Sequence, residues 1–126
     1  MRIDGHMHRG DDLKKRTKSF ALRVIRLVET LPKGKTTNII GRQLLRSGTS
    51  VGANYRAACR AKSPADFISK MGTVEEETDE SIFWMELLIE SGLMQEKLLK
   101  GLMCEAGEIL AIIVSSIKTV RKTAKS

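Results

Sequence analysis

The stretch SPADFISKMGTVEEETDESIFWMELLIESG, residues 63–92, carries both ends of one long helix. Ser63 is a good N-cap, Pro64 suits the first helical position, and Asp66 can return the capping-box hydrogen bond. Ser91-Gly92 is a typical helix stop. The predicted inner face repeats at helical spacing and consists of Phe67, Met71, Val74, Thr78, Met85 and Leu88.

Three further helices are predicted from the same periodicity. One spans residues 12–31, one runs over 37–61 from an N-cap at Thr37, and the last begins at residue 94. Their apolar stripes are Phe20, Val24, Leu27, Val28 and Leu31; Ile40, Leu44, Val51, Tyr55 and Ala58; and Leu98, Leu102, Ala106, Ile109, Ile113, Ile117 and Val120. Because the loops are short, we expect an all-α, antiparallel up-down-up-down four-helix bundle.

The 126 residues are enough for one domain. We expect the bundle over residues 13–122, a flexible tail over 1–12 and a basic tail over 123–126. Gly5-His6-Met7 is typical of a cloning remnant. The N-terminus has no apolar signal segment, and no apolar run approaches the roughly 18 residues of a membrane span. We therefore expect a cytoplasmic protein without a membrane partner.

Charge is divided between the two halves of the chain. Residues 1–70 hold 16 basic and 5 acidic residues, whereas residues 71–126 hold 6 basic and 10 acidic residues. In the helix predicted over 37–61, the 100° rotation per residue places four arginines within an arc of about 80°. They are Arg42, Arg46, Arg56 and Arg60, and Lys62 follows them.

This arginine face has two interpretations. In the first, it binds the phosphates of RNA or DNA, because arginine forks suit phosphate and no acid lies between residues 30 and 65. In the second, it is exposed to solvent or forms salt bridges with the acidic helix of the same or a neighbouring subunit. No aromatic residue lies on this face, so base stacking is not indicated.

Aromatic residues mark a second surface, on the helix predicted over 64–90. Phe83, Trp84 and Leu87 point about 100–160° away from the inner residue Met85. A helix that is apolar nearly all round is usually buried on two sides. We expect an interface between copies of the chain here, bordered by Glu75 and Asp79. The alternative is that the aromatic residues pack under loops or beside the last helix.

Catalytic, metal and cofactor sites are not predicted. The pairs Glu75/Asp79, Glu86/Glu90 and Glu105/Glu108 have helical spacing, but the last histidine of the chain is His8, so the Glu-x-x-His pattern of di-iron bundles is missing. Cys59 and Cys104 have neither a zinc-binding spacing nor a helix-borne base. We expect both to be buried or half-buried free thiols in a reducing compartment. The protein is therefore expected not to be an enzyme.

Three segments at this spacing resemble a known family. They are RSGTSVGANYRAACRA (46–61), SPADFISKM (63–71) and EEETDESIFWMELL (75–88). They resemble the bacterial four-helix bundle proteins encoded in intervening sequences of large-subunit ribosomal RNA genes, and are similar to the accessory variability determinant of diversity-generating retroelements. The resemblance covers residues 13–121.

The resemblance implies an antiparallel bundle that assembles as a ring-like homopentamer without catalytic residues. For the retroelement branch it implies binding to nucleic acid and to a reverse transcriptase through a basic surface. The matching positions here are Arg42, Arg46, Arg56 and Arg60.

Overall fold

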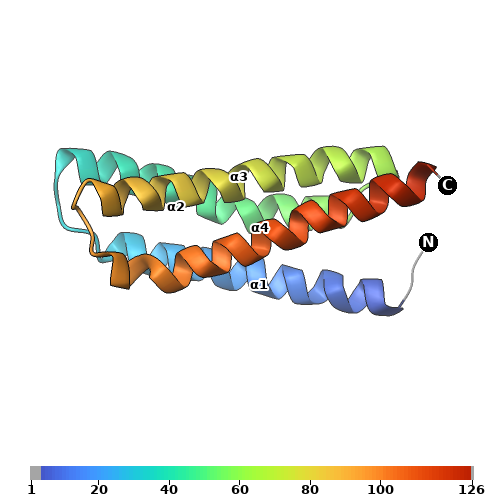
Figure 1. Ribbon diagram of the computed structural model, residues 1–126, viewed down its shortest axis with the longest axis horizontal. Coiled ribbons are helices and arrows are strands. Elements are labelled where there is room, and N and C mark those ends of the chain that lie inside the picture. The colour runs from blue at the N-terminus through green and yellow to red at the C-terminus, as the bar shows by residue number, and fades with distance from the viewer. Residues whose placement is uncertain (1–3, 126) are drawn as a thin grey trace.

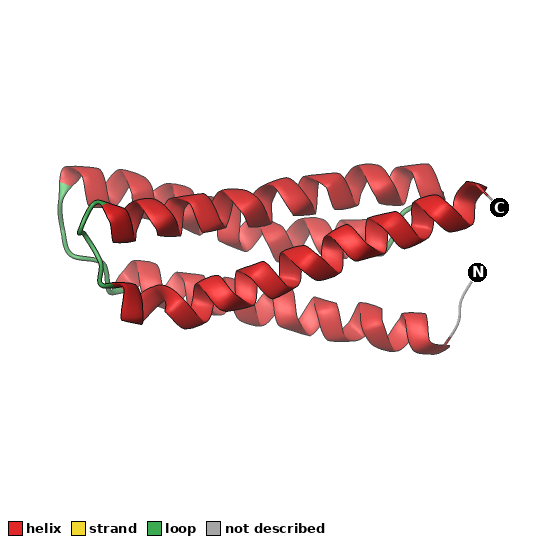
Figure 2. Cartoon of the chain, in the orientation of Figure 1, coloured by secondary structure: helices red, strands yellow, loops and turns green. Residues whose placement is uncertain are grey.

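The computed structural model describes residues 4–125, and all of its regular structure is helical (Figure 2). The four helices are α1 (Asp4–Glu29), α2 (Lys35–Ala58), α3 (Pro64–Glu90) and α4 (Glu96–Lys125). No strand occurs within these residues. The prediction of an all-α protein with four helices is therefore confirmed.

The helices lie lengthwise beside one another (Figure 1). The α1–α2 and α3–α4 connections lie at one end, whereas the α2–α3 turn lies at the other end with both chain termini. Of the four neighbouring pairs, α2 and α3 pack most extensively and α1 and α4 most sparsely. The ribbons of α1 and α4 separate toward the terminal end in Figure 1.

One core runs between the helices and follows the predicted stripes with a single shift of position. In α4, Leu99 is fully buried whereas Leu98, predicted to be inside, is 58% exposed. Both leucines are about one turn before Leu102, so the repeat admits either, but at 100° per residue the centre of the buried stripe lies about 40° from position 99 and about 60° from position 98. The fully buried core side chains include Phe20, Val24, Leu44, Val51, Met71, Val74, Met85, Leu88, Ile109 and Ile113.

Three helices extend beyond their predicted ends. α2 begins at Lys35 with Gly34 as its N-cap, and Thr37 is buried inside the helix, so the prediction of an N-cap at Thr37 is wrong. Residues 4–12, expected in a flexible tail, belong to α1, and residues 123–125, expected in a basic tail, belong to α4. Neither segment contains a proline to interrupt the helix. A Cβ at Gly10 would lie 3.8 Å from the Tyr55 hydroxyl, so the early part of α1 already packs against α2.

The start of α3 is as predicted, with one difference in its hydrogen bonds. The Asp66 amide donates to the Ser63 hydroxyl at 3.1 Å, which confirms Ser63 as the N-cap. The Asp66 carboxylate accepts from the backbone amide of Lys62 at 3.0 Å. In a standard capping box it would accept from the amide of the N-cap residue itself, which is Ser63. At the other end, Gly92 has a φ of 80°, a left-handed conformation that ends the helix.

Small residues bring α2 close to α1. A Cβ at Gly48 would lie 2.8 Å from a methyl group of Val24, and one at Gly52 would lie 3.3 Å from the backbone oxygen of Thr17. Ser47, also small, instead faces α3, where its hydroxyl accepts a buried hydrogen bond from Ser81 at 3.0 Å. The glycines of α2 therefore permit close helix packing.

Both cysteines are exposed free thiols, so the expectation that they are buried or half-buried is wrong. Cys59 follows the last residue of α2, and Cys104 lies on the outer side of α4. Within the residues described, none of the helices is long and apolar enough to cross a membrane.

Candidate nucleic-acid interface

The structure divides the predicted arginine face into different environments. Arg42 and Arg56 lie on α2, and Arg60 lies just beyond its end at Ala58. All three side chains are exposed, as is Lys62 in the turn to α3. None of these four forms a salt bridge with any side chain that the structure describes. Arg42 and Arg56 are 14 residues apart, or roughly 21 Å along the helix.

Arg46, between them, is held by the acidic helix of its own chain. Its guanidinium forms salt bridges with Glu77, at 3.1 Å, and with Glu80. Partial desolvation lowers the pKa of Arg46, but the charges and hydrogen bonds of the two glutamates outweigh this effect and raise it. Glu80 also accepts from the Trp84 indole at 3.0 Å. Arg46 therefore joins α2 to α3, and its charge is largely compensated.

Arg16 forms a similar double contact at the opposite seam, between α1 and α4. Its guanidinium donates to Glu105 at 2.7 and 2.9 Å and to Glu108 at 2.9 Å. The hydrogen bonds to Glu105 and Glu108 raise the pKa of Arg16, and the same contact lowers the pKa of Glu105. Sequence spacing does not reveal this contact, because positions 16 and 105 are 89 residues apart.

The two contacts join a basic half of the molecule to a mainly acidic half. Residues 13–65, which include most of α1 and all of α2, hold 13 basic residues and one acid, Glu29. Residues 66–126 hold 7 basic and 11 acidic residues. Because Arg16 and Arg46 lie at the seams, the positive charge that no acid compensates lies on the outer surface of α1 and α2.

The predicted aromatic surface on α3 is only partly exposed. Phe83 is 49% exposed, whereas Trp84 and Leu87 are half-buried. The Phe83 and Trp84 rings meet edge to face with their centroids 5.1 Å apart. Asp79 is exposed and Glu75 is half-buried. The structure therefore leaves Phe83 as the main apolar side chain that another molecule could cover here.

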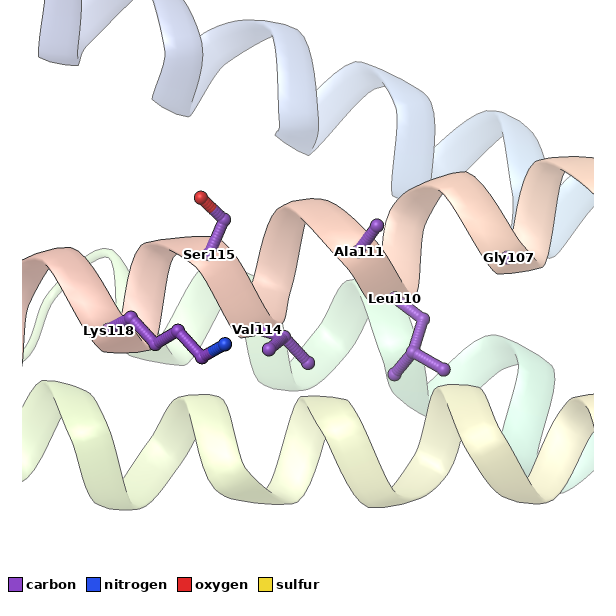
Figure 3. A pocket seen from close by; sticks show the side chains of 6 residues that line it. All are labelled: Gly107, Leu110, Ala111, Val114, Ser115 and Lys118. Carbon is purple, nitrogen blue, oxygen red and sulfur yellow. The ribbon is translucent and has the colours of Figure 1, made fainter.

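A shallow hollow of about 440 Å³ lies on the outer side of α4 (Figure 3). Leu110, Val114 and Lys118 are directed toward α3, and Ala111 and Ser115 point the opposite way. Gly107, Ala111 and Ser115 are four residues apart, which is the pattern that could have identified this surface from the sequence. Its lining offers one cation and no acid.

No arrangement typical of metal-dependent chemistry was found among the residues that the structure describes. Within them, no three histidine, cysteine, aspartate or glutamate side chains gather to hold a metal ion. Four acids of α3 and α4, Glu77, Glu80, Glu105 and Glu108, contact arginines. What the outer surface of α1 and α2 offers chemically is fixed cationic charge.

A four-helix protein with one strongly basic side is the class that these features define. Residues 11–115 match the family described as 23S rRNA-intervening sequence protein, and the chain belongs to this family. It is also similar to a solved structure from Bacteroides thetaiotaomicron VPI-5482, a protein of unknown function from the S23 ribosomal protein family. The two are 35% identical with a TM-score of 0.79, covering 84% of this chain and 98% of the other. No curated protein matches the chain.

Proposed function

We propose that this protein is a non-enzymatic accessory protein that binds RNA or DNA through the outer surface of α2. The residues assigned to phosphate binding are Arg42, Arg56, Arg60 and Lys62. Arg46 is left out of this set, because Glu77 and Glu80 already occupy its guanidinium.

The observation that carries the proposal is the unequal use of charge. The chain contains 15 acidic residues, yet only one lies within residues 13–65. Solvent-exposed helices usually carry both signs, which suppresses self-repulsion. A surface of one sign, with forked donors and no compensating acid, suits a polyanion.

The protein is further proposed to act as a homo-oligomer of up-down-up-down bundles. The exposed ring of Phe83 on α3 supports this, because exposed aromatic side chains commonly mark interfaces. The resemblance of the sequence to ring-forming bundle proteins favours a ring of five copies.

The test measures the affinity for fluorescently labelled RNA and DNA over a series of salt concentrations. We expect the logarithm of the affinity to fall linearly with the logarithm of salt. Replacing Arg56 and Arg60 by glutamine removes two phosphate contacts, so the slope should decrease by about 1.4 on single strands and about 1.8 on duplexes. Arg46→Gln is the internal control and should leave the slope nearly unchanged.

Two results would contradict the proposal. One is the absence of binding to either polymer at low salt. The other is a loss of affinity in Arg46→Gln as large as that in the Arg56/Arg60 variant, since that would assign the effect to the fold rather than to phosphate contacts.

A second candidate function is a protein assembly scaffold in which the arginine face meets the acidic α3 of a neighbouring copy. It is favoured by the exposed acids Glu76, Asp79, Glu86 and Glu90, which form no salt bridge with other described side chains. In this case the Arg56/Arg60 change lowers the mass of the particle measured by light scattering, with no nucleic acid present.

A further inference from the structure

A second basic stretch lies on α1, after the acidic residues Asp11 and Asp12. Lys14, Lys15 and Lys18 are exposed, and no acid occurs between Leu13 and Val28. Lys14 and Lys18 are four residues apart, so they point in the same direction from the helix. Neither forms a salt bridge with a described side chain.

Helix packing places these lysines alongside the arginines of α2. Thr17 of α1 lies against Gly52 of α2, where a Cβ would be 3.3 Å from the Thr17 backbone oxygen. Thr17 is next to Lys18 and within a turn of Lys14, and Gly52 is one turn before Arg56. The glycine allows the helix axes to approach to the lower end of the usual ~8–10 Å. Two rows of cations therefore run beside each other across this pair of helices.

The shoulder patch is defined as Lys14, Lys18, Arg56 and Arg60. Arg56 and Arg60 lie where α2 ends at its turn to α3, whereas Lys14 and Lys18 lie near the middle of the longer helix α1. The aromatic residues of α1 and α2 are Phe20 and Tyr55, and both are buried, at 0% and 6% exposure. The patch therefore offers two rows of charge and no ring on which a base can stack.

We propose that the shoulder patch binds the backbone of double-stranded nucleic acid, with the lysines of α1 contacting one strand and the arginines of α2 the other. This inference rests on the proposed function and adds α1 and the preference for a duplex to it. A duplex presents two phosphate strands across grooves of about 6 to 12 Å, which matches two cation rows one helix spacing apart. Proteins that hold single strands generally stack bases on aromatic side chains, which this surface lacks.

The phosphate contacts carry no base recognition, so RNA and DNA duplexes of different sequence should bind with similar affinity. The preference for a duplex should appear as tighter binding to a 20-base-pair duplex than to either of its strands alone. Fluorescence anisotropy at low salt measures both comparisons on the full-length protein.

The decisive variant is Lys14→Gln/Lys18→Gln, compared with Lys97→Gln/Lys100→Gln as a control. All four lysines are exposed, and the control pair lies on α4 and removes the same charge. On the duplex, the salt slope of the α1 variant should fall by about 1.8, whereas the control should keep the slope of the unmodified protein. Thermal unfolding followed by circular dichroism verifies that both variants are folded.

The outcomes separate the two proposals. If the α1 variant behaves like the control while Arg56→Gln/Arg60→Gln loses affinity, the shoulder patch is overturned and the proposed function stands. Equal or tighter binding to single strands overturns the preference for a duplex. The absence of binding to any of the polymers overturns the proposed function, and the inference falls with it.

Discussion

Arg16 and Arg46 have the same chemistry, and each contacts two glutamates across a helix seam. Arg46 shares the outer face of α2 with Arg42 and Arg56, so sequence spacing alone cannot distinguish it from them. What separates it is the position of Glu77 and Glu80 on the neighbouring helix. The acidic side chains on the neighbouring helix therefore decide whether an arginine forms a salt bridge within the fold or is available to a ligand.

The Arg16–Glu105 contact predicts a pH dependence of stability. The hydrogen bond from Arg16 holds the pKa of Glu105 below its ordinary value of 4.5. A carboxylate with a lowered pKa stabilises the fold fully above its unfolded pKa and loses this contribution as the pH falls through its folded pKa. Arg16→Gln should therefore reduce the free energy of unfolding by about 1 kcal/mol at neutral pH.

The difference between Arg16→Gln and the unmodified protein should shrink as the pH falls below 4.5. Urea unfolding at pH 7 and at pH 3 measures it. If Arg16→Gln lowers the free energy of unfolding equally at pH 7 and at pH 3, the hydrogen-bonded charge of Glu105 is not the source of the destabilisation.

A second prediction concerns the stability that the N-cap residue Ser63 gives to α3. Its hydroxyl accepts from the Asp66 amide at the start of α3. Ser63→Ala leaves that amide without its cap and should cost about 1 kcal/mol, whereas Ser63→Asp should retain most of the stability. Chemical denaturation of the two variants checks the order, and equal losses in both would argue against capping by an oxygen acceptor.

Within the elements, the glycines divide into those that contact a neighbouring helix and those that contact nothing. A Cβ at Gly48 would lie within 3.1 Å of three atoms of the buried Val24, whereas one at Gly72 would meet nothing within 4 Å. Gly48→Ala should destabilise the protein, because overpacking costs ~1–3 kcal/mol and exceeds the ~1 kcal/mol gained in helix propensity. Gly72→Ala should stabilise it by about 0.5–1 kcal/mol. Thermal unfolding measures both, and a shift of the same sign in the two variants would contradict this assignment.

Helix number and most of the core could be predicted from the sequence, because the apolar repeat is regular and Ser63 and Gly92 mark the ends of α3. The error at Leu98 arose where two leucines adjoin and the repeat alone does not select one. The ends of α1 and α4 were missed because polar residues without proline carry no stop signal. The seam contacts and the shoulder patch depend on which helices pack together, which periodicity within one helix does not specify.

For the whole molecule, the basic surface and the exposed aromatic ring lie on different helices. The basic surface belongs to α1 and α2, whereas the exposed ring of Phe83 belongs to α3 with its exposed acids. In the proposed function a polyanion binds on one side while another copy covers the other, so separate mutations should remove the two proposed activities one at a time.

Phe83→Ser is the change that tests this separation. If another copy covers Phe83, its loss should reduce the particle mass in light scattering toward the 14.0 kDa of one chain, because a buried aromatic side chain contributes strongly to an interface. The matched control is Leu22→Ser, since Leu22 is 44% exposed on α1 and Phe83 is 49% exposed on α3. The control should keep the mass of the unmodified protein.

The basic residues of α1 and α2 are unchanged in Phe83→Ser. Each subunit should therefore still bind a duplex, with weaker overall affinity because fewer copies act together. An unchanged mass in Phe83→Ser, or an unmodified protein that already has the mass of one chain, would contradict self-association through α3.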